Sequence, residues 1–173
     1  AFQQEWLAEF LDDAGQVFKG VNKVVDPGRS EASSPEPGRL YTLGVDPARV
    51  EDFTVLSVMD DLGKQVFHDR FNQISWELIT SRILNCTERY NATIVVESNG
   101  IGEPLYERLR ASGRRVEAFT TTNASKQALI DNLAMLIEQG RVSLMDIDAQ
   151  RNELISFQYE MTPARNIKMA APE

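Results

Sequence analysis

The chain has 173 residues, 42% of them hydrophobic, which is enough for one domain with a sizeable core and a short appendage. Its formal net charge is −8, with 18 basic and 26 acidic residues, and this balance argues against a uniformly basic nucleic-acid-binding module. The single cysteine, Cys86, and the single histidine, His68, exclude a disulfide framework and a cysteine- or histidine-rich metal site within the chain. The longest apolar runs fall short of the roughly 20 residues that span a bilayer, and no basic-then-apolar leader is present, so we expect a soluble intracellular protein without a membrane partner.

The first 39 residues predict an appendage. Residues 2–18 carry apolar side chains at helical spacing between Trp6 and Leu11. A helix this short is marginal in isolation, so we expect it to dock on another part of the protein. Residues 19–39 are rich in glycine, proline and serine, which is the composition of a linker.

Two apolar runs follow. Residues 41–45 end abruptly on Asp46, and a second run spans residues 53–59 after a short turn. This pattern predicts a β-hairpin, and because both runs are apolar at nearly every position, we expect strands covered on both faces. An aspartate at the end of a buried strand is costly unless it is solvated, paired or bound to a metal. Asp46 therefore either marks a functional site or simply emerges into water where its strand ends.

A second carboxylate closes a later strand. Residues 65–72 predict a third antiparallel strand, and Ser75 predicts the N-cap of an amphipathic helix. Residues 92–96 then form a short buried strand that ends on Glu97. The helix that begins at Thr122 or Asn123 is expected to bury Leu129, Leu133, Leu136 and Ile137. The other expected elements are a helix from Pro104 that stops before Gly113, a strand at 116–120, a docked segment at 144–147, a helix at 149–156, and a hairpin of 157–161 with 167–169.

Three antiparallel strands followed by strand–helix units predict an α/β fold with a mixed sheet flanked by helices. If the first and fourth strands are adjacent and parallel, Asp46 and Glu97 end at the same edge of the sheet, where open α/β folds bind ligands. Two carboxylates in one place repel each other unless a cation neutralises them. Hard oxygen ligands without histidine or cysteine point to Mg²⁺ or Mn²⁺. Two such ions about 3.5–4 Å apart can activate water and stabilise the leaving oxygen in phosphodiester cleavage.

These segments resemble a known family. Gly44-Val-Asp46 with its hairpin, followed by Val95-Val-Glu97-Ser-Asn-Gly-Ile-Gly102, is similar to the ribonuclease H-like nuclease domain of the large terminase subunit of tailed bacteriophages, which are viral DNA-packaging motors. Thr122-Asn-Ala-Ser-Lys126 and Gln4-Glu-Trp-Leu-Ala-Glu-Phe-Leu-Asp-Asp13 resemble the same family. The resemblance covers nearly the whole chain. It implies a ribonuclease H-like fold and a metal-dependent endonuclease that cuts concatemeric double-stranded DNA into genome lengths, in the host cytoplasm at the viral prohead.

The resemblance also implies a domain organisation. Residues 1–18 would be a helical segment leaving an ATPase domain, residues 19–39 a linker, and residues 40–173 the nuclease domain. No Gly-x-x-x-x-Gly-Lys-Ser/Thr loop is present, so the ATPase would belong to a preceding domain. The family's third core aspartate follows a segment like Ala171-Pro-Glu173, so we expect that ligand beyond residue 173 and the nuclease domain to be incomplete at its C-terminus. Portal protein and the small terminase subunit are the implied protein partners.

Carried over by this resemblance, Asp46 and Glu97 would bind the catalytic metals. Asp52, in the loop before the second strand, matches a further acidic residue that some members hold near the site, although an exposed turn carboxylate explains it almost as well. A sequence-independent grip on DNA phosphates is expected from sparse positive side chains near the acidic edge. The candidates are Arg49, Lys126, Arg165 and Lys168, each of which a plain surface charge also explains.

Three alternatives remain open. Sugar kinases and actin-like ATPases share such a hairpin, but theirs resembles Asp-x-Gly-Thr, whereas Asp46-Pro-Ala-Arg49 lacks the glycine that lets backbone amides approach phosphate. Junction resolvases and transposases share the acidic cluster, and the N-terminal helix and linker favour the terminase over them. The third alternative is a non-catalytic module that docks on capsid or portal proteins, which the net charge of −8 supports.

Overall fold

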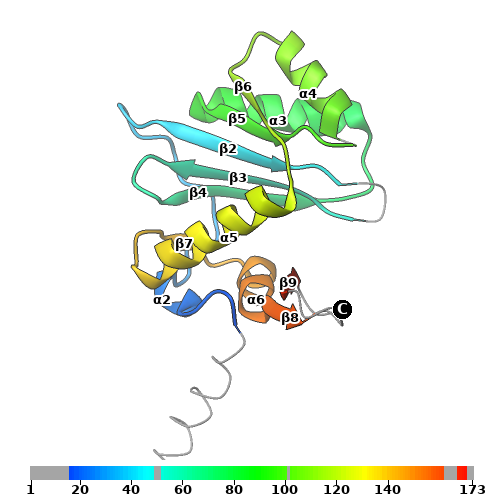
Figure 1. Ribbon diagram of the computed structural model, residues 1–173. Helices are drawn as coiled ribbons and strands as arrows, with labels where there is room; N and C mark the ends of the chain where they lie inside the picture. The colour runs from blue at the N-terminus through cyan, green and yellow to red at the C-terminus, as the bar shows by residue number, and fades with distance from the viewer. Residues whose placement is uncertain (1–15, 49–51, 101, 162–166, 171–173) are drawn as a thin grey trace, which may run out of the picture.

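A five-stranded mixed sheet lies at the centre of the computed structural model, which describes residues 16–48, 52–100, 102–161 and 167–170 (Figure 1). Its strands are β2 (Tyr41–Asp46), β3 (Thr54–Asp60), β4 (Gln65–Phe71), β5 (Thr93–Glu97) and β6 (Val116–Phe119), in the order β4-β3-β2-β5-β6. The strands β2, β3 and β4 are antiparallel neighbours, whereas β5 runs parallel to β2 and β6 parallel to β5. The mixed α/β sheet predicted from the sequence is confirmed.

Helices cover the two faces of the sheet unequally. On one face, α3 (Trp76–Tyr90) and α4 (Gly102–Ala111) pack against the strands and form the main core. The other face is crossed by the long helix α5 (Asn123–Glu138), which lies in front of the sheet in Figure 1. The fully buried side chains of the main core include Leu43, Leu56, Val58, Ile83, Ile94, Val96, Leu105 and Leu109.

Strand β2 alternates between these faces. Tyr41, Leu43 and Val45 are buried under α3 and α4, whereas Thr42 and Asp46 on the opposite face are exposed. The expectation that β2 is covered on both faces was therefore wrong. The run reads as apolar in sequence because its outward positions carry only the small residues Thr42 and Gly44 before Asp46.

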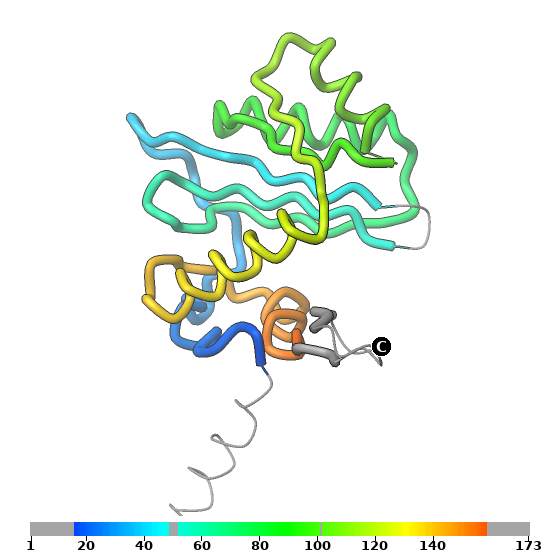
Figure 2. The backbone as a smooth tube through the Cα atoms, viewed as in Figure 1, coloured from blue at the N-terminus to red at the C-terminus, as the bar shows by residue number. Residues whose placement is uncertain are grey.

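A second, smaller core lies beyond the β4 edge of the sheet. It includes the short helix α2 (Val21–Val24), strand β1 (Val25–Asp26), strand β7 (Leu144–Met145) and helix α6 (Asp148–Ser156), with β1 and β7 paired in parallel. Figure 2 shows the blue N-terminal segment beside the orange segment of α6, which follows it only after more than a hundred residues. The packed side chains are Val17, Phe18, Val21, Val24, Val25, Ile137, Val142 and Leu144.

Part of the segment with linker composition is fixed to this core. Val21 and Val24 are buried, and Arg29 donates hydrogen bonds to the backbone oxygens of Gln65 and Ser143 and pairs with Asp26. The flanking glycines and prolines favour a flexible linker, but two valines one helical turn apart bury apolar surface and so stabilise a packed helix here. The proposed boundaries at residues 18 and 39 stay predictions, and most of the predicted helix at 2–18 lies outside the described residues.

The two helix starts expected near functional segments have side-chain caps. Ser75 caps α3 by accepting from the backbone N–H of Leu78, and Thr122 caps α5 through a reciprocal capping box with Ser125.

The late hairpin is present as β8 (Gln158–Met161) paired with β9 (Ile167–Ala170). No helix in the described part of the chain is both long and apolar enough to cross a membrane.

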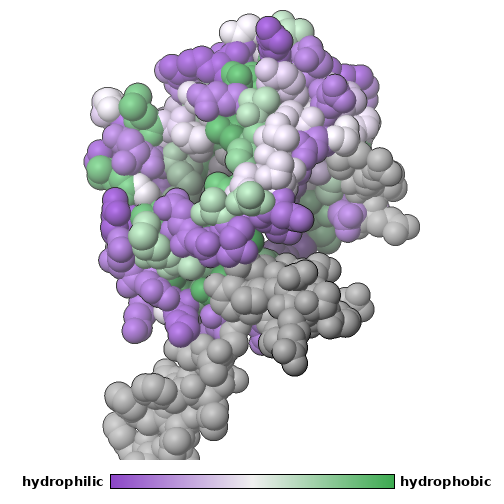
Figure 3. Space-filling model, viewed as in Figure 1, coloured by the Kyte–Doolittle hydropathy of each residue, from purple (hydrophilic) through white to green (hydrophobic). Residues whose placement is uncertain are grey.

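Helix α5 packs more loosely than its sequence suggested. Of its four expected core residues only Ile137 is buried, and Leu129 is 52% exposed. The helix meets the second core with its C-terminal half, so its first half projects over the sheet with few partners. Figure 3 shows the same side of the molecule, where apolar side chains gather over β5 and β6 and polar ones surround them.

Candidate active site

The two strand-ending carboxylates lie on the same face of the sheet. Asp46 ends β2 and Glu97 ends β5, and these strands are adjacent and parallel, with Val45 paired to Val96. The next residue on each strand is therefore Asp46 beside Glu97, both on the face away from α3 and α4. Neighbouring strands lie about 4.8 Å apart, which is close enough for both carboxylates to share a cation.

The pKa of Asp46 also indicates that charged groups meet at this edge. Asp46 is open to solvent, but neighbouring atoms partly enclose its carboxyl group, and this partial burial is the main cause that raises its pKa. The negative charge of Glu97 raises the pKa further. The positive charge of Lys126, in the first turn of α5, acts in the opposite direction on the pKa of Asp46. Asp46, Glu97 and Lys126 thus interact, although they come from three separate elements.

The backbone around Glu97 is tightly packed against the start of α4. A Cβ atom on Gly102 would lie 1.8 Å from the carbonyl oxygen of Glu97 and 3.6 Å from Cγ of Pro47. The amide of Gly102 also donates to the carbonyl of Asn99, at 3.0 Å. Only a residue without a side chain allows α4 to begin this close to the end of β5.

The turn after Glu97 is also bound to the segment after β6. The amide of Ser98 donates to the carbonyl of Phe119 at 2.9 Å, and its hydroxyl contacts the same carbonyl at 3.3 Å. The side-chain amide of Asn99 donates to the carbonyl of Thr121 at 2.6 Å. These contacts fix Glu97 relative to the residues that begin α5.

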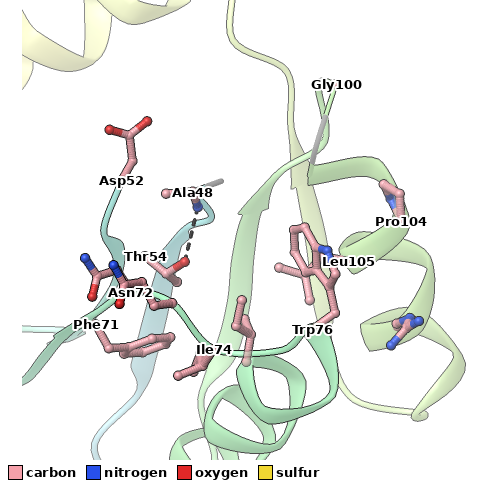
Figure 4. Close-up of a pocket in the computed structure, with 13 residues that line it drawn as sticks. Ala48, Asp52, Thr54, Phe71, Asn72, Ile74, Trp76, Gly100, Pro104 and Leu105 are labelled. Atoms are coloured by element: carbon pink, nitrogen blue, oxygen red, sulfur yellow. Dashed lines mark hydrogen bonds between the residues drawn. The ribbon is translucent and has the colours of Figure 1, made fainter. Parts of the chain in front are cut away.

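Asp52 occupies a different place. It lines a cavity of about 940 Å³ between the start of β3, the end of β4 and the first turns of α3 and α4, with Thr54, Phe71 and Trp76 (Figure 4). This cavity opens on the side of the sheet that α3 and α4 cover, whereas Asp46 and Glu97 face the other side. Within the residues that the structure describes, no three His, Cys, Asp or Glu side chains are grouped so as to hold a metal ion. Asp52 therefore does not complete a three-ligand cluster with Asp46 and Glu97.

Of the positive side chains predicted to contact DNA, only Lys126 can be placed. It lines a cavity of about 390 Å³ under α5, together with Val55, His68 and Arg70. Since Val55 is paired with Asp46, this cavity adjoins the carboxylate edge. Arg49 and Arg165 lie outside the described residues, and Lys168 lies in β9, where only the backbone is described.

Comparison with known proteins agrees with this geometry. A family model described as the terminase RNaseH-like domain matches residues 43–163, which is most of the chain. The chain belongs to this family. The match includes both strand-ending carboxylates and Lys126, and the fold class and the family expected from the sequence are confirmed.

Individual members of the terminase family are similar over almost the full chain. The large terminase subunit of Thermus virus P23-45 is 31% identical over 98% of this chain, which spans only 37% of that relative's length. The large terminase nuclease of the thermophilic phage G20c, solved with bound magnesium, superposes with a TM-score of 0.84 at 27% identity, over 92% of this chain and 89% of that one. The nuclease domain of Thermus phage P74-26 gives a TM-score of 0.80 at 28% identity, over 90% and 85% of the two chains.

The sequence analysis did not identify several residues at the edge of the sheet that carries Asp46 and Glu97. Arg70 of β4 is paired with Val55 and so lies on the same face as Asp46, with its guanidinium 3.6 Å from the ring centre of Phe53 and 3.2 Å from the carboxylate of Glu153. Gly102 and Asn99 were recognised only as parts of a motif. The alternation of β4 could have placed Arg70 on this face, but no local signal reports the close approach at Gly102.

Proposed function

We propose that this chain is the metal-dependent endonuclease part of a viral DNA-packaging motor, with Asp46 and Glu97 as metal ligands. The observation that carries the proposal is the placement of these two carboxylates at the ends of adjacent parallel strands, on one face, beside Lys126. Family membership and the likeness to the G20c nuclease support it. Because the chain spans 37% of its curated relative, the activity of the whole protein is part of the proposal.

The donor set suits a hard divalent cation. Both side chains offer carboxylate oxygens, which Mg²⁺ and Mn²⁺ prefer. Burial and then the negative charge of Glu97 raise the pKa of Asp46, and a cation between the two carboxylates relieves their mutual repulsion. Magnesium is the ion bound in one G20c nuclease structure, and cobalt in another. When bound, such ions activate water and stabilise the oxygen that leaves phosphorus, and a pair of them is the expected arrangement.

The protein's own groups would hold and orient the DNA. Asp46 and Glu97 fix the position of the cation, and Lys126 contacts a phosphate oxygen of the strand to be cut. Arg70 adds a positive charge on the same face, two strands from Asp46. Arg49, Arg165 and Lys168 remain proposed phosphate contacts, and Asp52 remains a proposed accessory acid at the rim. Contacts of this kind grip any sequence, as packaging of whole genomes requires.

Family membership supports a proposal about the partners and the cellular setting. Double-stranded DNA is the proposed substrate, and an ATPase domain elsewhere in the full-length protein would drive its movement. The portal protein and the small terminase subunit are the proposed protein partners, with action in the infected host cell at the prohead. The chain's organisation as a helical segment, a linker and a nuclease domain belongs to the same proposal.

The test is nicking of supercoiled plasmid by the full-length protein in the presence of Mn²⁺. Asp46→Asn and Glu97→Gln keep the shape of each side chain and remove its charge, and each is expected to lower the nicking rate at least about 100-fold. The matched control is Asp61→Asn, which removes one carboxylate from the turn after β3, at the opposite end of the sheet. Nicking that survives Asp46→Asn, or that needs no divalent metal, would overturn the assignment. Plasmid left intact by the unmodified protein would instead favour a docking module.

A further inference from the structure

One hydrogen bond joins the loop of Glu97 to the segment that begins α5. The side-chain amide of Asn99 donates to the carbonyl oxygen of Thr121 at 2.6 Å, and the side chain is half-buried. The backbone carbonyl of Asn99 accepts from Gly102 at 3.0 Å. Asn99 is therefore held on both sides, and its side chain bridges two loops that are not neighbours in sequence.

The segment to which Asn99 donates its hydrogen bond also positions Lys126. Thr121 directly precedes the cap residue Thr122, whose hydroxyl accepts from the amide of Ser125 at 3.1 Å. The amide of Lys126 donates to the carbonyl of Thr122 at 2.9 Å. A shift of Thr121 would thus carry the first turn of α5, and Lys126 with it, away from the carboxylates.

Besides burial, the charges of Glu97 and Lys126 act on the pKa of Asp46, which Glu97 raises and Lys126 lowers. Glu97 lies two residues before Asn99, and Lys126 lies five residues after Thr121. The Asn99–Thr121 hydrogen bond is the side-chain link between these two short stretches that lies nearest to α5. Ser98 supports it with a weaker contact of 3.3 Å to the carbonyl of Phe119.

We propose that Asn99 is a positioning residue, whose side-chain amide fixes Glu97 and Lys126 relative to each other around Asp46. The inference rests on the proposed function, in which Asp46 and Glu97 bind the metal. It requires a donor at this position, because the partner is a backbone carbonyl. An aspartate of the same shape would present an oxygen to that oxygen and break the link.

The experiment compares two variants of the full-length protein with a matched control. Asn99→Asp keeps the shape but removes the donor, and Asn99→Ala removes the side chain without adding charge. The control, Asn85→Asp, makes the same chemical change at an exposed position on α3, away from the carboxylate edge. The Mn²⁺ concentration that gives half-maximal plasmid nicking is measured for each, with Mn²⁺ binding measured by calorimetry and the melting temperature as a separate readout.

Both Asn99 variants are expected to raise the half-saturating Mn²⁺ concentration roughly 10- to 100-fold, as loss of groups that orient metal ligands does. Asn85→Asp is expected to leave it unchanged. A role in folding alone would lower the melting temperature and leave half-saturation at the value of the unmodified protein, and that result would overturn the inference. If the unmodified protein shows no Asp46-dependent nicking, the proposed function fails instead.

A second pair of variants covers the case in which Asn99 variants do not fold. Ser98→Ala removes the hydroxyl contact to Phe119, whereas Ser98→Thr retains a hydroxyl. Weaker Mn²⁺ binding in Ser98→Ala that Ser98→Thr restores would support the same link between the two loops. Equal Mn²⁺ binding in Ser98→Ala and the unmodified protein would count against it.

Discussion

Substitution of Gly102 by alanine offers the sharpest test of how Glu97 is held. The added Cβ would lie 1.8 Å from the carbonyl oxygen of Glu97, and real contacts of this kind do not fall below 3.0 Å. The start of α4 and the end of β5 must therefore separate by about 1.2 Å, and because the opposing atom is backbone, no side-chain rotation can relieve the overlap. Overpacking of this sort costs about 1–3 kcal/mol.

The consequence for activity is larger than the consequence for stability. A displacement of about 1 Å at a catalytic group can lower a rate roughly 100-fold. We expect Gly102→Ala to remain folded, to melt a few degrees lower, and to nick plasmid with Mn²⁺ about 100-fold more slowly in the full-length protein.

Gly113→Ala is the matched control for this experiment. Gly113, which follows the other end of α4, has a φ of +74°, but a Cβ added there would meet no atom within 4 Å. The substitution costs about 1–2 kcal/mol of backbone strain without touching Glu97. Thermal melting and nicking rates are compared for both variants. Equal loss of activity in the two, or full activity in Gly102→Ala, would refute the reasoning.

Three further predictions concern stability and reactivity. Both ring nitrogens of His68 are buried without a hydrogen-bond partner in the described part of the chain, and burial is the main cause that lowers its pKa below the ordinary 6.5, so the unfolded chain binds the proton more readily. Stability is therefore expected to fall as the pH drops below about 6.5, and urea unfolding at pH 7.5 and 5.5 should show a smaller difference for His68→Phe than for the unmodified protein. Thr122→Ala removes the cap of α5 and is expected to cost about 0.5–2 kcal/mol in the same assay, whereas Thr121→Ala, outside the capping box, should cost less. Burial raises the pKa of the Cys86 thiol to about 12, so a thiol reagent at pH 8 should label it only after urea unfolds the protein, and fast labelling of the folded protein would contradict the buried position.

The sequence was informative wherever a local pattern determines a position in the sheet. Two apolar runs ending on Asp46 and Glu97 predicted a shared edge on the condition that their strands are adjacent and parallel. The parallel pairing of β2 with β5 meets that condition. Ser75 was identified as a cap, and the cap of α5 was narrowed to Thr122 or Asn123, because capping depends on residues within one helical turn. These inferences needed no knowledge of distant contacts.

Other features depend on contacts that no local pattern reports. The position of Lys126 near the acidic edge was expected only from the family resemblance, because it results from the direction in which α5 crosses the sheet. The need for glycine at position 102 results from how closely α4 approaches β5. Leu129 was expected in the core from its spacing, but it borders the cavity under α5 and is 52% exposed. The valines of α2 were hidden in a segment whose overall composition is that of a linker.

The attachment of that segment has a mechanical consequence. Tension applied to the chain ahead of Gln16 would act on the buried valines of α2 and on the hydrogen bonds of Arg29 to the backbone of β4 and to Ser143. It would not be taken up by the extension of a flexible linker. Residues 30–39, which follow this attachment, would carry little of the load. A pull on the N-terminal side would therefore move the sheet as a rigid body, and the carboxylate edge would turn with it.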